Sequence, residues 1–140
     1  MTALSAHRID HVGVVVRDAD ESIAWHSSNF GFVVDSDELI HGDTQNVRLV
    51  FLVPGPGAGP AATALQLVSP IADGPIARYL AEHGEGIHHV CFAVEDVAAA
   101  TVAVGDTATV PFVGGKGRLC SFPVGVPASL RLELVEESAP

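Results

Sequence analysis

The sequence predicts one α+β domain made of two tandem βαβββ modules, whose strands form a cupped, barrel-like mixed sheet around a metal site. Three observations lead to this class. A ten-residue motif occurs twice, the ends of the two halves also match, and each half alternates between strand-like and helix-like apolar patterns. With 140 residues, the chain is long enough for a single domain with its own apolar core.

The internal repeat is the strongest of these signals. Residues 9–18 and 87–96 share the frame I-x-H-V-x-x-x-V-x-D, with five identities in ten positions. The two halves end in the similar segments LQLV at 65–68 and LELV at 132–135. Because the two matches occur in the same order, we interpret the chain as an internal duplication.

The first half reads as a strand, a helix and three further strands. A stretch rich in β-branched residues at 8–16 predicts the first strand. Asp18 and the acidic residues after it predict the start of a helix, which Gly31 ends. The Gly/Pro-rich segment 55–60 predicts a flexible loop. The remaining strands are expected at 32–35, 47–54 and 63–68.

The second half repeats this order after a linking helix. Asp73 is the expected N-cap of that helix, and Gly84 is expected to end it. The second module opens at Ile87, and its own helix begins near Asp96 and stops early. The resulting boundaries are 7–70 for module one, 73–83 for the linking helix and 86–136 for module two.

Charge and hydropathy limit the classes of function. Seventeen acidic against seven basic residues give a net charge of −10, which disfavours nucleic acids and anionic membrane surfaces as partners. The apolar runs are strand-sized, far shorter than the ~20 residues of a membrane span. No secretory signal pattern opens the chain, and its two cysteines form no CxxC motif. We therefore expect a cytoplasmic protein that acts on a small molecule.

Four residues at equivalent places of the two modules predict a metal site. His11 and His89 occupy the same position of the repeated motif, and Gln66 and Glu133 occupy the same position of the terminal segments. Two imidazole nitrogens and two oxygens suit one divalent ion such as Co²⁺, Ni²⁺, Zn²⁺, Mn²⁺ or Fe²⁺. An octahedral ion would keep two positions for substrate, which is typical of a catalytic site. A lone histidine on a strand is more often a packing residue, so the prediction rests on the symmetry of all four.

Three stretches of sequence resemble a known family. They are Ile9-Asp-His-Val-Gly13, Gln66-Leu-Val-Ser-Pro70 and Gly84-Glu-Gly-Ile-His-His-Val90, of which the last is the most specific. The chain resembles the vicinal oxygen chelate superfamily over residues 7–136. That superfamily includes glyoxalase I, extradiol dioxygenases and antibiotic resistance proteins. Within it, the chain is most similar to the methylmalonyl-CoA epimerases.

The resemblance implies a function and a role for the same four residues. It implies His11, Gln66, His89 and Glu133 as ligands of one divalent ion, with Glu133 also catalytic. It implies a metal-dependent epimerase or isomerase that forms an enolate from a methylmalonyl-CoA-like thioester, in a protein that pairs as a homodimer. The metal would stabilise charge where charge develops.

Basic residues are the candidates for binding the anionic parts of such a substrate. The resemblance aligns Arg48 with a second catalytic glutamate of the family, and arginine cannot act as a general base. Arg48 would suit a carboxylate or phosphate instead. Arg131 is expected on the same strand face as Glu133. The Gly-rich loop with Lys116 and Arg118 is a further candidate anion contact.

Two other classes of function remain open from the sequence. One is another enzyme of the superfamily, such as a lyase, cyclase or dioxygenase acting on a natural-product intermediate. The other is a non-catalytic protein that binds a small molecule, as resistance proteins do. The complete ligand set favours an enzyme over a binding protein.

Overall fold

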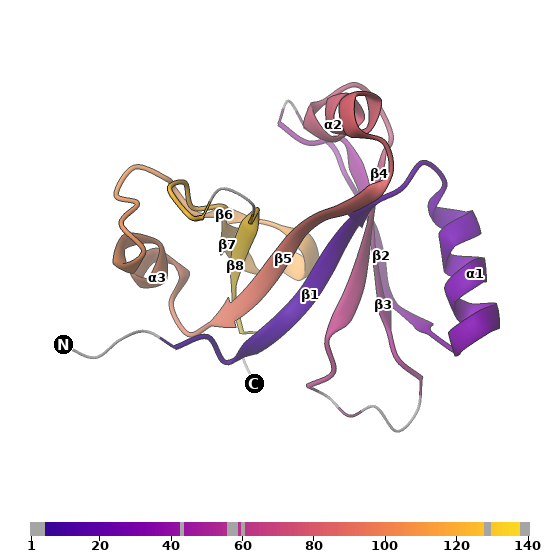
Figure 1. Cartoon of the computed structure of the whole chain (residues 1–140), viewed down its shortest axis with the longest axis horizontal. Helices are drawn as coiled ribbons and strands as arrows, with labels where there is room; N and C mark the ends of the chain where they lie inside the picture. The colour runs from indigo at the N-terminus through magenta and orange to yellow at the C-terminus, as the bar shows by residue number, and fades with distance from the viewer. Residues whose placement is uncertain (1–4, 43, 56–58, 60, 128–129, 138–140) are drawn as a thin grey trace. The chain divides into compact units, whose positions relative to one another are not determined.

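A computed structural model describes most of the chain (Figure 1). It divides into two compact units, of which one is residues 12–88 and the other is residues 1–11 with 89–140. The chain passes from one unit to the other within β1 (Arg8–Val15) and within β5 (Gly86–Val94). The single-domain organisation stays a prediction. The described residues are 5–42, 44–55, 59, 61–127 and 130–137.

The order of elements confirms an α+β chain with a duplicated βαβββ module. The first module consists of β1, α1 (Ala19–Phe30), β2 (Val33–Ile40), β3 (Val47–Val53) and β4 (Ala64–Pro70). The linking helix is α2 (Pro75–His83). The second module consists of β5, α3 (Val97–Ala103), β6 (Phe112–Val113), β7 (Leu119–Ser121) and β8 (Leu132–Glu136), with a 3₁₀ turn at Gly115–Gly117.

The last residue of the repeated motif caps a helix in both modules. The Asp18 side chain accepts a hydrogen bond from the backbone N–H of Glu21, and the Asp96 side chain accepts one from that of Ala99. Both caps satisfy a donor that the first helical turn leaves unpaired. The repeat therefore extends from sequence to local structure.

Within the unit of residues 12–88, the strands lie in the order β2-β3-β4-β1. The β2–β3 and β3–β4 pairs are antiparallel. Side chains alternate between the two faces of these strands. One face carries Val50, Leu52 and Leu67, which pack with Ala19 and Ile23 of α1. Figure 1 shows α1 running alongside β2 and β3.

The opposite face of the same sheet carries Gln66. Residues directly opposite each other in an antiparallel pair point to one face, and Gln66 is opposite Phe51 of β3. Its neighbours on this face include Leu49 and Val68, which pack with Tyr79 of α2. One end of this face is thus covered by α2, and Gln66 lies on the face that α1 does not cover.

Within the other unit, the strand order is β1-β5-β8-β7-β6, with β5 and β8 parallel and β7 antiparallel to both β6 and β8. One face packs against α3 through Leu132, Leu134 and Val97. The other face holds an apolar cluster that includes Cys91 and Cys120. Glu133 is paired with Cys91 across β5 and β8, so it points away from α3.

The structure departs from the predicted elements in two places. β2 extends to Ile40 because it pairs with β3 along its whole length, although its sequence is polar. The N-cap of α2 is Gly74 and not Asp73. Part of the predicted loop at 55–60 lies outside the described residues. None of the helices that the structure describes has an apolar stretch long enough to cross a bilayer.

We expect the two helix caps to make equal contributions to stability. Asp18→Ala and Asp96→Ala should each lower the free energy of unfolding by about 1 kcal/mol, because each leaves a helix N–H without its acceptor. Asparagine at either position should retain most of the stability, since it caps as well as aspartate. Urea denaturation of the four variants measures both effects. Equal losses for alanine and asparagine would contradict the capping role.

Candidate metal centre

Three buried side chains from three strands converge at one point. His11 comes from β1, His89 from β5 and Glu133 from β8. His11 Nε2 lies 3.1 Å from His89 Nε2, and Glu133 Oε1 lies 3.0 Å from the first nitrogen and 3.2 Å from the second. The exposed fractions of the three residues are 2%, 5% and 8%. The structure therefore brings together three of the four predicted ligands, within one compact unit.

The chemistry of this group fits a divalent cation. Glu133 Oε1 is buried and accepts no hydrogen bond from any residue that the structure describes, although it lies beside two imidazoles. A buried carboxylate oxygen without a hydrogen bond is costly. Two imidazoles and a carboxylate are ligands that Zn²⁺, Fe²⁺ and Co²⁺ accept, and a cation among them would satisfy all three lone pairs.

The charges of the three groups depend on one another. Burial by itself would raise the pKa of Glu133, but the neighbouring His11 and His89 outweigh it and lower this pKa to about 2. Burial would lower the pKa of His11, but hydrogen bonding to Asp10 and the charge of Glu133 raise it. The carboxylate is therefore ionised at neutral pH, as a metal ligand has to be.

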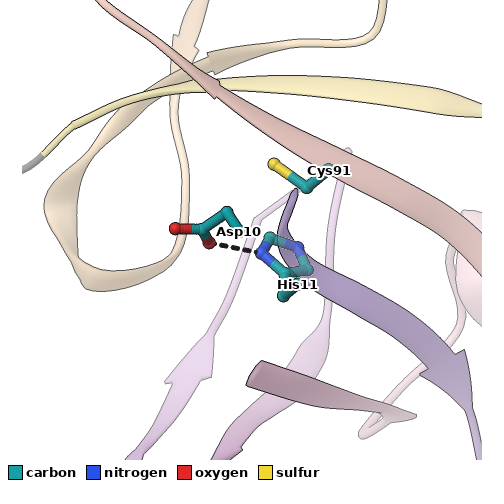
Figure 2. Close-up of side chains that lie close together, drawn as sticks. All are labelled: Asp10, His11 and Cys91. Carbon is teal, nitrogen blue, oxygen red and sulfur yellow. Dashed lines mark hydrogen bonds and ion pairs between the residues drawn. The ribbon is translucent and has the colours of Figure 1, made fainter. Parts of the chain in front are cut away.

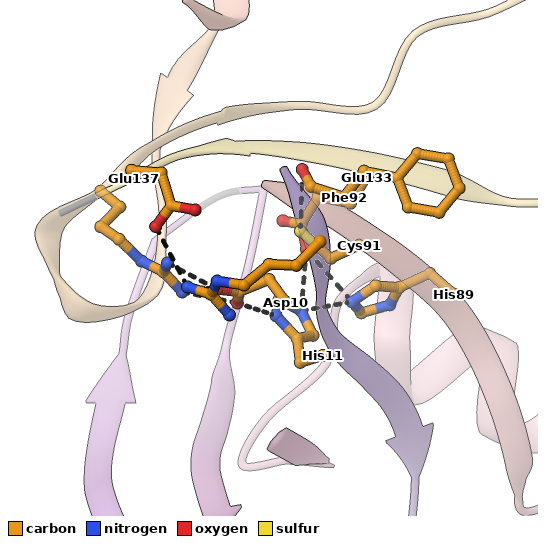
Figure 3. A network of polar contacts seen from close by, with 9 residues as sticks. Asp10, His11, His89, Cys91, Phe92, Glu133 and Glu137 are labelled. Atoms are coloured by element: carbon orange, nitrogen blue, oxygen red, sulfur yellow. Dashed lines mark hydrogen bonds and ion pairs between the residues drawn. The ribbon is translucent and has the colours of Figure 1, made fainter. Parts of the chain in front are cut away.

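A second group of side chains holds the His11 ring from behind. Asp10 Oδ2 lies 2.7 Å from His11 Nδ1. Arg118 donates two hydrogen bonds of 2.8 Å to the two oxygens of Asp10. Figure 3 follows these contacts from Glu137 through Asp10 and His11 to His89 and Glu133. With the Nδ1 proton donated to Asp10, His11 Nε2 keeps its lone pair for a ligand.

A different trio, consisting of Asp10, His11 and Cys91, is also compact (Figure 2). It is a poorer metal site for two reasons. Asp10 already accepts hydrogen bonds from Arg118 at both oxygens. Burial raises the pKa of the Cys91 thiol well above its usual range, and only the thiolate is a good ligand. We therefore assign the candidate metal centre to His11, His89 and Glu133.

Gln66, the fourth predicted ligand, belongs to the other compact unit. It is 5% exposed, and within the described chain its Oε1 atom has no hydrogen-bond partner. A buried amide oxygen left in this state is uncommon and calls for an explanation. Coordination of a cation would provide one, and the role of Gln66 as a ligand stays a prediction.

The structure corrects the expectation for Arg48. In the β3–β4 register Arg48 is opposite Ser69, so it lies on the α1 face and not on the face of Gln66. Its guanidinium binds both oxygens of Asp37, at 3.0 and 2.8 Å, and one oxygen of Asp20 on α1 at 2.9 Å. Neighbouring residues of a strand point to opposite faces of the sheet. The face of Arg48 therefore depends on the strand register, which the sequence alone could not reveal.

The other predicted substrate contacts have separate outcomes. Arg118 is buried and paired with Asp10, so the structure gives it a partner inside the protein in place of a substrate anion. Lys116 is exposed in the 3₁₀ turn, with a left-handed φ of 60°. Arg131 is exposed just before β8. Substrate binding by Lys116 and Arg131 stays a prediction.

Sequence reasoning missed two polar residues of the Gln66 face, Glu38 and Ser36. Glu38 of β2 pairs with Leu49 of β3, and Leu49 pairs with Val68 of β4. Because Val68 is two residues from Gln66 on the same strand, Glu38 lies on the Gln66 face. Ser36 reaches the same face opposite Phe51, and its buried Oγ has no hydrogen-bond partner among the described residues. The polar sequence of β2 hid these residues, because it lacks the apolar alternation that identifies a strand face.

Comparison with known proteins identifies the family. A family model described as the glyoxalase/bleomycin resistance protein/dioxygenase superfamily matches residues 10–116. The chain belongs to this superfamily. The match begins at Asp10 and includes two members of the metal centre, His11 and His89.

Curated relatives of the chain include an epimerase. The chain is 34% identical over 98 residues to an ethylmalonyl-CoA/methylmalonyl-CoA epimerase of Cereibacter sphaeroides, a match that covers 66% of this chain and 65% of the relative. It is 26% identical over 87 residues to the uncharacterized protein YqjC of Bacillus subtilis, covering 61% of this chain and 56% of YqjC. The matches thus span less than two thirds of the length of either relative.

Solved structures show the same fold over nearly the whole chain. A variant of Streptomyces coelicolor methylmalonyl-CoA epimerase in complex with 2-nitronate-propionyl-CoA superimposes with a TM-score of 0.83 at 30% identity, covering 96% of this chain and 100% of that one. A methylmalonyl-CoA epimerase from Mycobacterium tuberculosis gives a TM-score of 0.81 at 28% identity, covering 100% and 94%. The predicted vicinal oxygen chelate fold is therefore confirmed.

We expect the metal centre to be lost when one of its ligands is removed. His89→Ala and Glu133→Ala should each abolish binding of one Co²⁺ per chain at micromolar protein, because the remaining donors cannot hold the ion tightly. Gln66→Ala tests the fourth ligand in the same way. Elemental analysis and Co²⁺ titration after dialysis against a chelator measure the effect. His83→Ala, at the exposed end of α2, is the control and should bind like the wild type. Wild-type affinity in Glu133→Ala would refute the assignment.

Proposed function

We propose that this protein is a metal-dependent epimerase that acts on the CoA thioester of a 2-alkylmalonate, such as methylmalonyl-CoA. The observation that carries the proposal is the convergence of His11, His89 and Glu133 in a chain with the epimerase fold. A related methylmalonyl-CoA epimerase, 30% identical over 96% of this chain, has been solved in complex with methylmalonyl-CoA. The homodimer, the cytoplasmic location and the lack of nucleic-acid partners stay predictions.

The proposed metal site suits the first half of such a reaction. His11, His89 and Glu133, with Gln66 as the fourth ligand, would hold one divalent cation, which when bound supplies Lewis-acid stabilisation of the negative charge on the substrate. The C2 proton of a malonyl thioester is acidic because its loss leaves an enolate. We assign removal of that proton on one side to Glu133, which is ionised at neutral pH.

Inversion at C2 also requires a proton donor on the opposite side of the enolate. β3 offers no carboxylate on the Gln66 face, since Val47, Leu49 and Phe51 are apolar and Arg48 points to α1. We assign this role to Glu38. It is a half-buried carboxylate on the same face, two strands from β4 or roughly 10 Å across the sheet.

Two further polar residues lie on the same face as Glu38. On its face, Gln66 Oε1 and Ser36 Oγ are buried polar atoms without hydrogen-bond partners in the described part of the chain. Leu49 and Phe51 between them are apolar and almost completely buried. Binding of a cation or a small molecule would give these two polar atoms partners.

Deuterium exchange tests the reaction. In D₂O with Co²⁺ present, the protein should exchange the C2 proton of methylmalonyl-CoA and convert a single enantiomer into a mixture of both, because the planar enolate can be protonated from either side. Mass spectrometry records the exchange, and circular dichroism follows the loss of optical activity. Glu133→Ala is the matched control and should show only the spontaneous background. Exchange without inversion would point to another enolate reaction and overturn the epimerase assignment.

Glu38→Gln should separate the two proton transfers. We expect interconversion of the enantiomers to fall by roughly 10²- to 10⁴-fold, the usual contribution of a general acid or base. One enantiomer should still exchange its C2 proton, because Glu133 is intact. Asp37→Asn is the matched control, since the neighbouring Asp37 pairs with Arg48 on the α1 face. Equal exchange of both enantiomers by Glu38→Gln would remove Glu38 from the mechanism.

A further inference from the structure

A cluster of four charged residues lies behind the metal centre within one compact unit, and two of them, Asp10 and Arg118, are buried. Asp10 is its centre and is 5% exposed. Arg118 contacts both carboxylate oxygens at 2.8 Å, and Arg8 Nη2 lies 3.1 Å from Oδ1. Arg8 in turn donates a hydrogen bond of 3.1 Å to Glu137 Oε2. Figure 3 shows this network continuing from Asp10 to His11.

We propose that Asp10, held by Arg118, is a positioning residue that fixes the ring orientation and tautomer of His11 and so sets the affinity of the metal centre. The inference rests on the proposed metal site. Asp10 acts through the 2.7 Å contact with His11 Nδ1, whereas the predicted ligand atom is Nε2 of the same ring. Two arginines fix the position of its carboxylate, so the imidazole has one preferred orientation.

The geometry of the pair supports a role beyond stability. Bidentate contact between a guanidinium and a carboxylate fixes the plane of the carboxylate as well as its position. An ordinary buried ion pair is weak evidence for stability, because desolvation of the charges offsets their attraction. Here the carboxylate has a further acceptor function, since the same oxygen that binds Arg118 Nη2 also contacts the His11 ring.

The second module does not repeat this arrangement. At the offset of 78 residues that relates His11 to His89, Asp10 corresponds to His88. His88 forms an edge contact with the ring of Tyr79, at 4.7 Å between centroids. The two modules thus share the ligand histidine but differ at the residue before it. The carboxylate behind His11 is a specific feature of the first module.

Metal affinity and the state of the His11 ring test the proposal. Asp10→Asn should weaken Co²⁺ binding by roughly 10- to 100-fold, the usual effect of losing a partner behind a ligand histidine. The stoichiometry should stay at one ion per chain, while the visible absorption bands of bound Co²⁺ shift because the ring is no longer held. In ¹⁵N NMR of Asp10→Asn without added metal, the Nδ1–H form should no longer be the main tautomer of His11.

A second variant covers the case in which Asp10→Asn fails to fold because it leaves Arg118 buried without a counter-ion. Asp10→Asn combined with Arg118→Met removes both charges, and replacing a whole buried pair is far better tolerated than breaking it. The matched control is Asp37→Asn with Arg48→Met, which removes another bidentate pair, on the α1 face. It should change stability and leave Co²⁺ affinity and the His11 tautomer unchanged.

Two outcomes separate this proposal from the metal site itself. If the wild type binds no Co²⁺, the proposed function fails, while the NMR measurement still decides whether Asp10 sets the His11 tautomer. If the wild type binds Co²⁺ and the Asp10→Asn/Arg118→Met variant binds it with the same affinity, spectrum and tautomer, the positioning role is wrong. Equal loss of affinity in the control pair would also overturn it, since the effect would then be one of general stability.

Discussion

The close approach of two imidazole nitrogens and one carboxylate oxygen in a buried place is the constraint on which this structure depends. Atoms that carry lone pairs do not gather within 3.2 Å of one another away from water unless a proton or a cation lies between them. Burial makes the requirement stronger, because no water replaces the missing partner. The rest of the unit provides the strands that hold the three atoms and the charges that keep them in the required state.

The two modules share their local structure but carry different polar residues. In both, the final aspartate of the motif caps the following helix. The modules differ in the terminal strand, where Gln66 stands in the first and Glu133 in the second. They differ again before the histidine, where Asp10 occurs once and His88 takes its place in the other copy. A duplicated framework has thus acquired an asymmetric set of polar groups.

Membership of the superfamily and the epimerase fold restrict the chemistry without deciding it. Folds of this kind support several reactions, so the function has to be argued from the site. The candidate metal centre combines two imidazoles with the carboxylate of Glu133, a set of ligands suited to a Lewis-acidic cation. Epimerisation needs two proton carriers, and our proposal takes the second one from β2 because β3 carries no carboxylate.

The sequence alone determined the duplication, the order of elements and the residues most suited to bind a metal. These features are local, since they depend on apolar period, capping residues and a motif that repeats at a fixed offset. Only the tertiary structure decided which face each polar residue occupies. Arg48 and Glu38 show why: side chains alternate along a strand, so the face depends on a register that neighbouring strands impose. The pairing of Asp10 with Arg118, 108 residues away, likewise left no local pattern in the chain.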